Sequence, residues 1–136
     1  MNSEAKTLLV VDDNPAIREG LEELFRYQGY HVLTAIDGEA GLRAVRAERP
    51  DLMVLDVAMP GLDGFHVASE IKNDPTLTRM PIILYSGHLG DGFAFLAYQT
   101  KAEYFLPKVG DLRPILKAVR DLLETPDLLR EARLQG

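Results

Sequence analysis

The chain of 136 residues contains no cysteine, which excludes a disulfide framework, a thiolate zinc site and a cysteine nucleophile. It also lacks an apolar run of signal-peptide or membrane-spanning length, a pattern that favours a cytoplasmic protein with no membrane partner. Basic side chains are few, because 15 Lys and Arg stand against 21 Asp and Glu, for a net charge of −6. Nucleic-acid backbones are bound by an excess of Lys and Arg, so direct nucleic-acid binding is not expected.

The composition that remains is that of one globular domain. Hydrophobic residues make up 46% of the chain and charged residues 26%, which is enough apolar surface for a buried core. The length suits a single domain, and neither a repeat nor a low-complexity segment is present. We expect this domain over residues 1–124, with residues 125–136 forming a short tail or the start of a linker helix.

Apolar runs typical of buried strands alternate along the chain with segments of helical periodicity. The predicted strands cover residues 7–11, 31–35, 52–55, 81–85 and 103–106. Each is followed by a predicted helix, the first running to about Gln28 and the fourth from Phe93 to Lys101, after a glycine-rich stretch expected to be a mobile loop. Right-handed crossovers between such strands produce a doubly wound α/β sandwich, in which a parallel sheet is covered by helices on both faces.

Reactive side chains follow the ends of four predicted strands. Asp12 and Asp13 come after the first strand, Asp56 after the third, Ser86 after the fourth and Lys108 shortly after the fifth. In a doubly wound sheet these ends meet where ligands bind. Clustered carboxylates repel one another, and a hard divalent cation, Mg²⁺ or Mn²⁺, offsets that repulsion with Asp13 and Asp56 as ligands and Asp12 behind them.

A site of this kind suits phosphoryl transfer, in which positioning and charge neutralisation supply most of the catalysis. A carboxylate can act as the nucleophile and carry an acyl phosphate. Asp56 is the best candidate because it ends the central strand. Lys108 supplies a fixed positive charge, and the Ser86 hydroxyl is a donor for a phosphoryl oxygen.

Four motifs occur in order along the chain: Val10-Val11-Asp12-Asp13-Asn14, the stretch from Leu55 to Gly64, Ser86-Gly87, and Lys108. Together they resemble the response-regulator receiver domains of the CheY-like superfamily, which serve two-component phosphorelay signalling, over roughly residues 6–123. The resemblance implies a flavodoxin/CheY-like three-layer sandwich with five parallel strands in the order 2-1-3-4-5. It also implies residue roles: Asp56 as phospho-acceptor, Asp12, Asp13, Asp56 and the Ala58 backbone carbonyl as the magnesium site, Lys108 as the phosphate partner, and Ser86 and Phe105 as switch residues.

By the same resemblance, a histidine kinase or phosphotransfer protein would phosphorylate Asp56 in a magnesium-dependent reaction. A conformational switch would then re-form the surface of the fourth helix, fifth strand and fifth helix for a downstream protein. Whether phosphorylation also produces a homodimer stays open. The chain would not be an enzyme for external substrates, and its own chemistry would be limited to self-phosphorylation from small donors and autodephosphorylation.

Several positions depart from the family pattern or have a second interpretation. The family usually has a proline after its lysine, whereas here Pro107 precedes Lys108 and Val109 follows it. Phe105 could equally be an ordinary core residue. In the family, the positions of Ala58 and His88 border the path of the water that hydrolyses the acyl phosphate, so both are predicted to tune the lifetime of the signal.

Two other functions compete with phosphorylation-switched signalling. Hydrolases of the haloacid dehalogenase type also form an aspartyl phosphate, but they carry a second acid two residues after the nucleophile, where this chain has Ala58. A receiver-like module that binds partners without phosphorylation is disfavoured by the intact set of acids, Ser86 and Lys108. The sequence leaves open whether the domain stands alone or belongs to a longer regulator.

Overall fold

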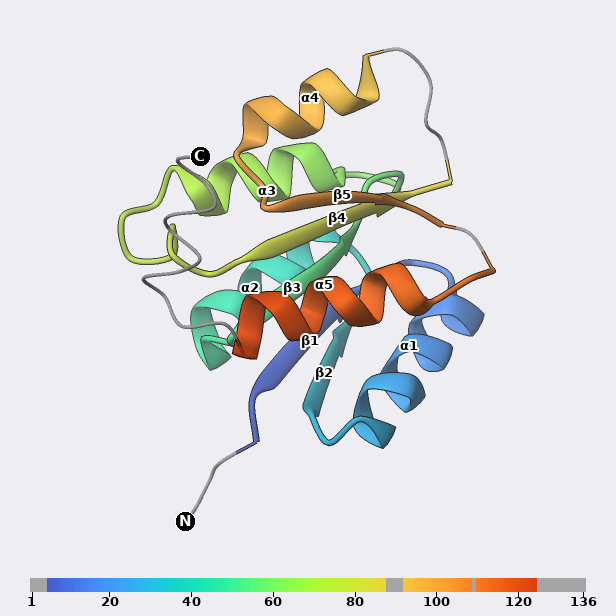
Figure 1. Cartoon of the computed structure of the whole chain (residues 1–136). Coiled ribbons are helices and arrows are strands. Elements are labelled where there is room, and N and C mark those ends of the chain that lie inside the picture. The colour runs from blue at the N-terminus through green and yellow to red at the C-terminus, as the bar shows by residue number, and fades with distance from the viewer. Residues whose placement is uncertain (1–4, 88–91, 109, 125–136) are drawn as a thin grey trace.

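The computed structural model describes residues 5–87, 92–108 and 110–124. Five parallel strands form one sheet in the order β2-β1-β3-β4-β5, and helices connect them (Figure 1). The elements in chain order are β1 (Thr7–Val11), α1 (Pro15–Tyr27), β2 (His31–Ala35), α2 (Gly38–Glu48), β3 (Leu52–Asp56), α3 (Gly64–Lys72), β4 (Ile82–Ser86), α4 (Phe93–Thr100), β5 (Tyr104–Pro107) and α5 (Arg113–Glu124). The predicted doubly wound fold and its strand order are confirmed.

Helices cover both faces of the sheet, with α1 and α5 on one face and α2, α3 and α4 on the other (Figure 1). Successive side chains of a strand point to opposite faces, so Leu8 and Val10 of β1 enter one core while Leu9 and Val11 enter the other. The central strands β3 and β4 are buried along their whole length. This explains their continuous apolar sequence, since a strand covered on both faces has no polar side to alternate with.

Local sequence signals set the helix boundaries. The Asn14 side chain caps α1 by accepting hydrogen bonds from the N–H groups of Ala16 (2.9 Å) and Ile17 (3.2 Å), and Pro15 occupies the first turn. Gly29, at a φ of 97°, lies beyond the end of this helix, as predicted. The strands β4 and β5 each begin one residue later than the sequence suggested. Most of the loop expected to be mobile, residues 88–91, lies outside the described residues.

The two helices nearest β5 differ in how they are held. α5 buries Ile115, Ala118, Val119 and Leu122 against the sheet. α4 buries only the small residues Ala97 and Thr100, begins without a side-chain cap, and contains no charged residue. Its large apolar side chains Phe95, Leu96 and Tyr98 are exposed instead. None of the helices within the described ranges is long and apolar enough to cross a membrane.

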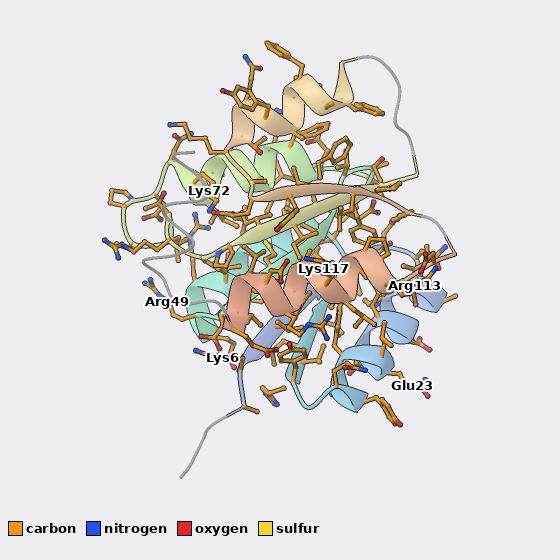
Figure 2. The ribbon with its side chains drawn as sticks, in the orientation of Figure 1. Lys6, Glu23, Arg49, Lys72, Arg113 and Lys117 are labelled. Carbon is orange, nitrogen blue, oxygen red and sulfur yellow. The ribbon has the colours of Figure 1, made fainter. Side chains whose placement is uncertain are left out.

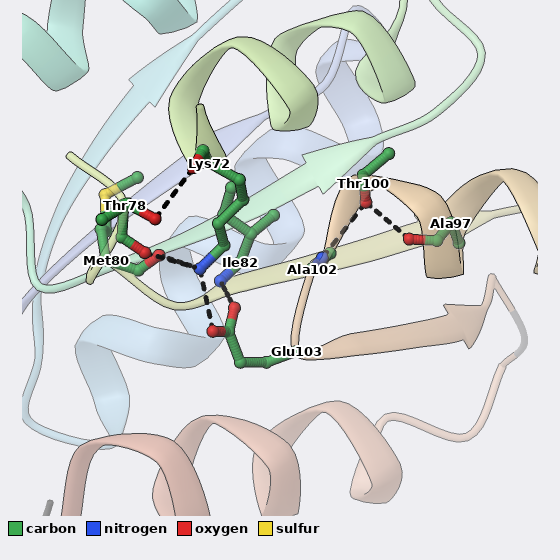
Figure 3. Close-up of polar contacts among 8 residues, drawn as sticks. All are labelled: Lys72, Thr78, Met80, Ile82, Ala97, Thr100, Ala102 and Glu103. Carbon is green, nitrogen blue, oxygen red and sulfur yellow. Dashed lines mark hydrogen bonds and ion pairs between the residues drawn. The ribbon is translucent and has the colours of Figure 1, made fainter. Parts of the chain in front are cut away.

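A buried ion pair joins α3 to the segment before β5 at the edge of the sheet where β4 and β5 begin (Figure 3). Lys72 Nζ lies 2.8 Å from Glu103 Oε2 and also donates to the backbone carbonyls of Thr78 (3.2 Å) and Met80 (2.9 Å). Glu103 Oε1 accepts the N–H of Ile82 (2.8 Å). The charged side chains of Glu23, Arg113 and Lys117, by contrast, come from helices α1 and α5 and are exposed to solvent (Figure 2).

Candidate functional site

The carboxyl-terminal edge of the sheet brings together the side chains that the sequence singled out. Asp12 and Asp13 follow β1, Asp56 and Ser86 are the last residues of β3 and β4, and Lys108 follows β5 directly. Carboxylate oxygens of the three acids lie within 4.8 Å of one another. Residues up to 96 positions apart in the sequence therefore form one site, because parallel strands end on the same side of the sheet.

The three carboxylates differ in exposure. Asp12 and Asp56 are 0% and 1% exposed, whereas Asp13 is exposed to solvent. Lys108 Nζ lies 3.0 Å from Asp12 Oδ2 and 3.0 Å from Asp56 Oδ1. A single ammonium group thus faces two buried carboxylates, with a third at the rim. The site carries an excess of negative charge that a further cation would neutralise.

Burial raises the pKa of Asp56 to about 6. The neighbouring charge of Asp12 adds to this rise, while Lys108 and the backbone of Ala58 oppose it. Asp56 Oδ1 is buried and accepts no well-aligned hydrogen bond from the residues that the structure describes, although Lys108 is close to it. This buried oxygen shares its one nearby ammonium group with Asp12 and lies beside two further carboxylates, an arrangement that fits a hard cation with oxygen ligands.

Both carboxylate oxygens of Asp12 accept hydrogen bonds from other groups of the protein. Oδ1 accepts the N–H of Asn14 (2.9 Å), and Oδ2 accepts the hydroxyl of Tyr85 and faces Lys108. Tyr85 is a site residue that the sequence does not single out, because it lies within an apolar strand. The available signal was a hydroxyl directly before Ser86, in register with Asp56 on the next strand.

Electrostatic shifts accompany these contacts. The pKa of the Tyr85 hydroxyl is raised far above its ordinary value, first by burial and then by the carboxylate of Asp12. Burial lowers the pKa of Lys108, but the hydrogen bonds and charges of Asp56 and Asp12 outweigh that effect and raise it. The lysine therefore remains a permanent cation at neutral pH. Its Nζ also lies 4.8 Å from the centre of the Tyr85 ring.

The remaining predicted residues surround this cluster in different ways. Ser86 is fully buried, and its backbone carbonyl accepts the N–H of Lys108 (2.8 Å). Ala58 is exposed on the loop after β3. Phe105 is partly buried and packs against the core on the side of α3 and α4. His88, the predicted rate-tuning residue, and Val109, which replaces the family's proline, lie outside the described residues.

The loop that follows Asp56 is folded closely against its own strand. The N–H of Gly64 donates to the carbonyl of Val57 (2.9 Å), and a Cβ at Gly64 would come within 2.8 Å of Val57 Cα. Only glycine permits this approach. Asp63 then caps α3 by accepting the N–H of His66 (3.0 Å). The turn formed by Leu62, Asp63 and Gly64 thereby packs against the backbone of Asp56 and Val57.

A doubly wound sheet in this strand order, with an acidic cluster and a lysine at its carboxyl-terminal edge, defines the CheY-like class of receiver folds. The sequence model of the family "Response regulator receiver domain" matches residues 8–120 of the chain. The chain therefore belongs to the response regulator receiver domain family, a signalling domain of two-component systems rather than a conventional enzyme.

Individual relatives agree with this assignment. The transcriptional regulatory protein AfsQ1 of Streptomyces coelicolor is 38% identical over 117 residues, which are 86% of this chain and 51% of that protein. The chain thus spans about half the length of this curated relative. Response regulator TrrA of Thermotoga maritima, solved in complex with Mg²⁺-BeF, has a TM-score of 0.79 at 33% identity and matches 87% of this chain and 99% of its own. Chemotaxis protein CheY4 of Vibrio cholerae has a TM-score of 0.82 at 25% identity and matches 88% and 100%.

Proposed function

We propose that Asp56 accepts a phosphoryl group from a histidine kinase or phosphotransfer protein in a magnesium-dependent reaction. The observation that carries this proposal is the environment of Asp56 Oδ1, which is buried, accepts no well-aligned hydrogen bond from the described residues, and lies 3.0 Å from Lys108 Nζ. An ionised carboxylate oxygen with only the lysine ammonium group beside it can serve as a nucleophile. The adjacent ammonium group is placed to neutralise the charge that the reaction brings in.

In the transfer step, an oxygen of ionised Asp56 forms a bond to phosphorus. The bond from phosphorus to the leaving atom breaks at the opposite side, and its electron pair stays with the leaving group, which is a histidine nitrogen in a kinase or an acetate oxygen in acetyl phosphate. Lys108 and the hydroxyl of Ser86 then contact the phosphoryl oxygens. No proton needs to leave Asp56 above its pKa of about 6.

For the cation, we infer that Asp13, Asp56 and the backbone carbonyl of Ala58 provide direct ligands while Asp12 supports them. The exposure of Asp13 and the spacing of the carboxylate oxygens within 4.8 Å support this set. The magnesium in the related TrrA structure supports Mg²⁺ as the ion, and Mn²⁺, which prefers the same oxygen ligands, remains a prediction. When bound, the ion neutralises charge on the phosphoryl oxygens.

The proposed output is a switch that involves Ser86 and Phe105 and re-forms the α4-β5-α5 face for a downstream protein. Support comes from α4, which has no charged residue and exposes Phe95, Leu96 and Tyr98. Large exposed apolar groups on one short helix are typical of a protein contact surface. The alternative partner for this face is a second copy of the chain, in a homodimer that forms on phosphorylation. Ala58 and His88 are the candidates for tuning the lifetime of the phosphoryl group.

The domain limits of residues 1–124, the tail of 125–136 and a cytoplasmic location also remain predictions. The output of any longer protein is also a prediction, because the match with this chain covers only 51% of AfsQ1. The competing proposal of a receiver-like module that acts without phosphorylation is distinguished by the experiment below.

The deciding experiment is intact-mass measurement after incubation with Mg²⁺ and acetyl phosphate or phosphoramidate. We expect the wild-type protein to gain one phosphoryl group and the Asp56→Asn variant to gain none. A wild-type chain that stays unmodified with every donor would exclude phospho-acceptance and leave the phosphorylation-independent module. Equal modification of both proteins would place the acceptor elsewhere.

Hydrogen–deuterium exchange tests the output face. Phosphorylation of the wild type should change backbone protection in α4 and β5 more than in α1 and α2, and sedimentation of the same sample reports whether a dimer forms. Uniform protection changes, or changes confined to α1, would contradict the proposed α4-β5-α5 switch. The Asp56→Asn variant treated with the same donor is the control.

A further inference from the structure

Tyr85 connects the two oppositely charged parts of the site. Its side chain is buried on the face of the sheet covered by α1 and α5, where Leu106 and Ile115 also pack. From there its hydroxyl donates a hydrogen bond to Asp12 Oδ2, and its ring lies 4.8 Å from Lys108 Nζ. One residue therefore contacts both a carboxylate and the ammonium group that the proposed reaction uses.

The tyrosine and the lysine share the same oxygen of Asp12. Oδ2 is 3.0 Å from Lys108 Nζ and accepts the Tyr85 hydroxyl, while Oδ1 is taken by the N–H of Asn14 at 2.9 Å. A hydrogen bond from a neutral donor stabilises a carboxylate and reduces its attraction for other cations. Tyr85 thus limits how strongly Asp12 attracts Lys108, which also lies 3.0 Å from Asp56 Oδ1.

We propose that Tyr85 is a positioning residue for the phosphorylation site, which restrains the buried Asp12 carboxylate so that Lys108 is shared with Asp56. This inference rests on the proposed function, because it concerns the same site. The hydroxyl keeps Asp12 an internal anchor, so that it does not compete for the cation bound by Asp13 and Asp56. It also leaves Lys108 close enough to Asp56 to meet an incoming phosphoryl group.

The test is Tyr85→Phe, which keeps the ring and removes the hydroxyl. Asp12 then becomes a stronger partner for cations. We expect Mg²⁺ to bind about three- to tenfold more tightly by calorimetry, since a hydrogen bond to a charged group has been lost. Phosphorylation by acetyl phosphate at saturating Mg²⁺ should become about three- to tenfold slower, because Lys108 is drawn from Asp56 toward Asp12.

The opposite directions separate positioning from a structural effect, since a loosened site would bind Mg²⁺ more weakly as well as react more slowly. The matched control is Tyr30→Phe, which removes a tyrosine hydroxyl bonded to the Glu124 carboxylate (3.1 Å) away from the site. It should change neither quantity. Unchanged Mg²⁺ affinity and rate in Tyr85→Phe, or both weakened together, would overturn the proposal.

A second measurement does not depend on the stability of the variant. The chain has no tryptophan, so its near-ultraviolet absorption beyond phenylalanine comes from its 5 tyrosines. Mg²⁺ should perturb this absorption in the wild type and in Tyr30→Phe but not in Tyr85→Phe. No change in the wild type, or the same change in Tyr85→Phe, would contradict the coupling. If the wild type is not phosphorylated, only the proposed function is contradicted. The proposal for Tyr85 is tested separately by the Mg²⁺ affinity and by the tyrosine absorption.

Discussion

Two lysines that pair with carboxylates, the buried Lys72 and the partly exposed Lys108, lie at opposite edges of the same sheet and have very different surroundings. Lys72 is paired with one carboxylate, Glu103, and its ammonium group has three acceptors, two of them backbone carbonyls (Figure 3). Lys108 faces the two buried carboxylates of Asp12 and Asp56, with the exposed Asp13 nearby. The first cluster has balanced charge, and the second has an excess of negative charge.

This difference separates an ion pair that holds the fold from one that is prepared for a reaction. Around Lys72, each donor of the lysine and both oxygens of Glu103 have partners, so nothing in the cluster favours a further ligand. Around Lys108, Asp56 Oδ1 accepts no well-aligned hydrogen bond from the described residues, and its pKa is raised to about 6. Burial alone does not identify a functional charge; incomplete compensation does.

The largest expected effect is loss of stability in Lys72→Met. The change leaves Glu103 buried without its cation, so we expect the free energy of unfolding to fall by about 3–5 kcal/mol in urea denaturation. Lys117→Met is the control, because Lys117 forms an exposed pair with Asp121, and it should cost no more than about 0.5 kcal/mol. Equal effects of the two variants would contradict the structural role of Lys72.

The next effect concerns the pH dependence of Asp56. Because its folded pKa of about 6 exceeds the ordinary 3.8, the folded state binds the proton more tightly, and stability is lost as pH rises from about 3.8 to 6. Asp56→Asn removes this loss. Without Mg²⁺, the variant should be about 1–3 kcal/mol more stable than the wild type at pH 7. The difference in unfolding free energy between the variant and the wild type should approach zero near pH 4. Urea denaturation at pH 4 and pH 7 measures this difference and shows which protein is the more stable.

Binding of Mg²⁺ should raise the free energy of unfolding by a similar amount. At a concentration about 100 times its dissociation constant, the ion should stabilise the wild type by about 2.7 kcal/mol. Asp56→Asn should lose most of this increment, while Lys72→Met should keep it, because the two lysine clusters share no residue and effects of independent sites add. Thermal denaturation with Mg²⁺ and with a chelator measures it, and a reduced increment in Lys72→Met would show that the clusters are coupled.

The smallest expected effect is on phosphorylation in Lys72→Met. Under conditions where this variant is folded, its rate with acetyl phosphate should stay within about twofold of the wild type, since independent sites do not couple. Intact-mass measurement over time provides the rate. A much slower reaction would mean that the Lys72 cluster also controls the site at the opposite edge.

The sequence by itself determined the architecture and most of the site. The central strands have continuous apolar runs, and the partly exposed edge strands β2 and β5 are short β-rich segments between helical patterns. The start of each of the five strands was therefore predicted to within one residue, and the alternation with helices indicated a parallel sheet. Asp12, Asp13, Asp56, Ser86 and Lys108 were predictable for the same reason, since each lies at or just after the end of such a run. Parallel strands carry their ends to one edge whatever the details of packing.

Only the tertiary structure decided how these groups divide their roles. Asp12 and Asp13 are neighbours in the chain, yet one is fully buried and the other exposed, because Tyr85 of β4 and Lys108 after β5 contact Asp12. Lys72 and Glu103, 31 positions apart, gave no local signal of pairing. Periodicity records which face a residue occupies, but the partner it meets there depends on strand register and on loops elsewhere in the chain. For the same reason Tyr85, which looks in sequence like one more strand residue, belongs to the site.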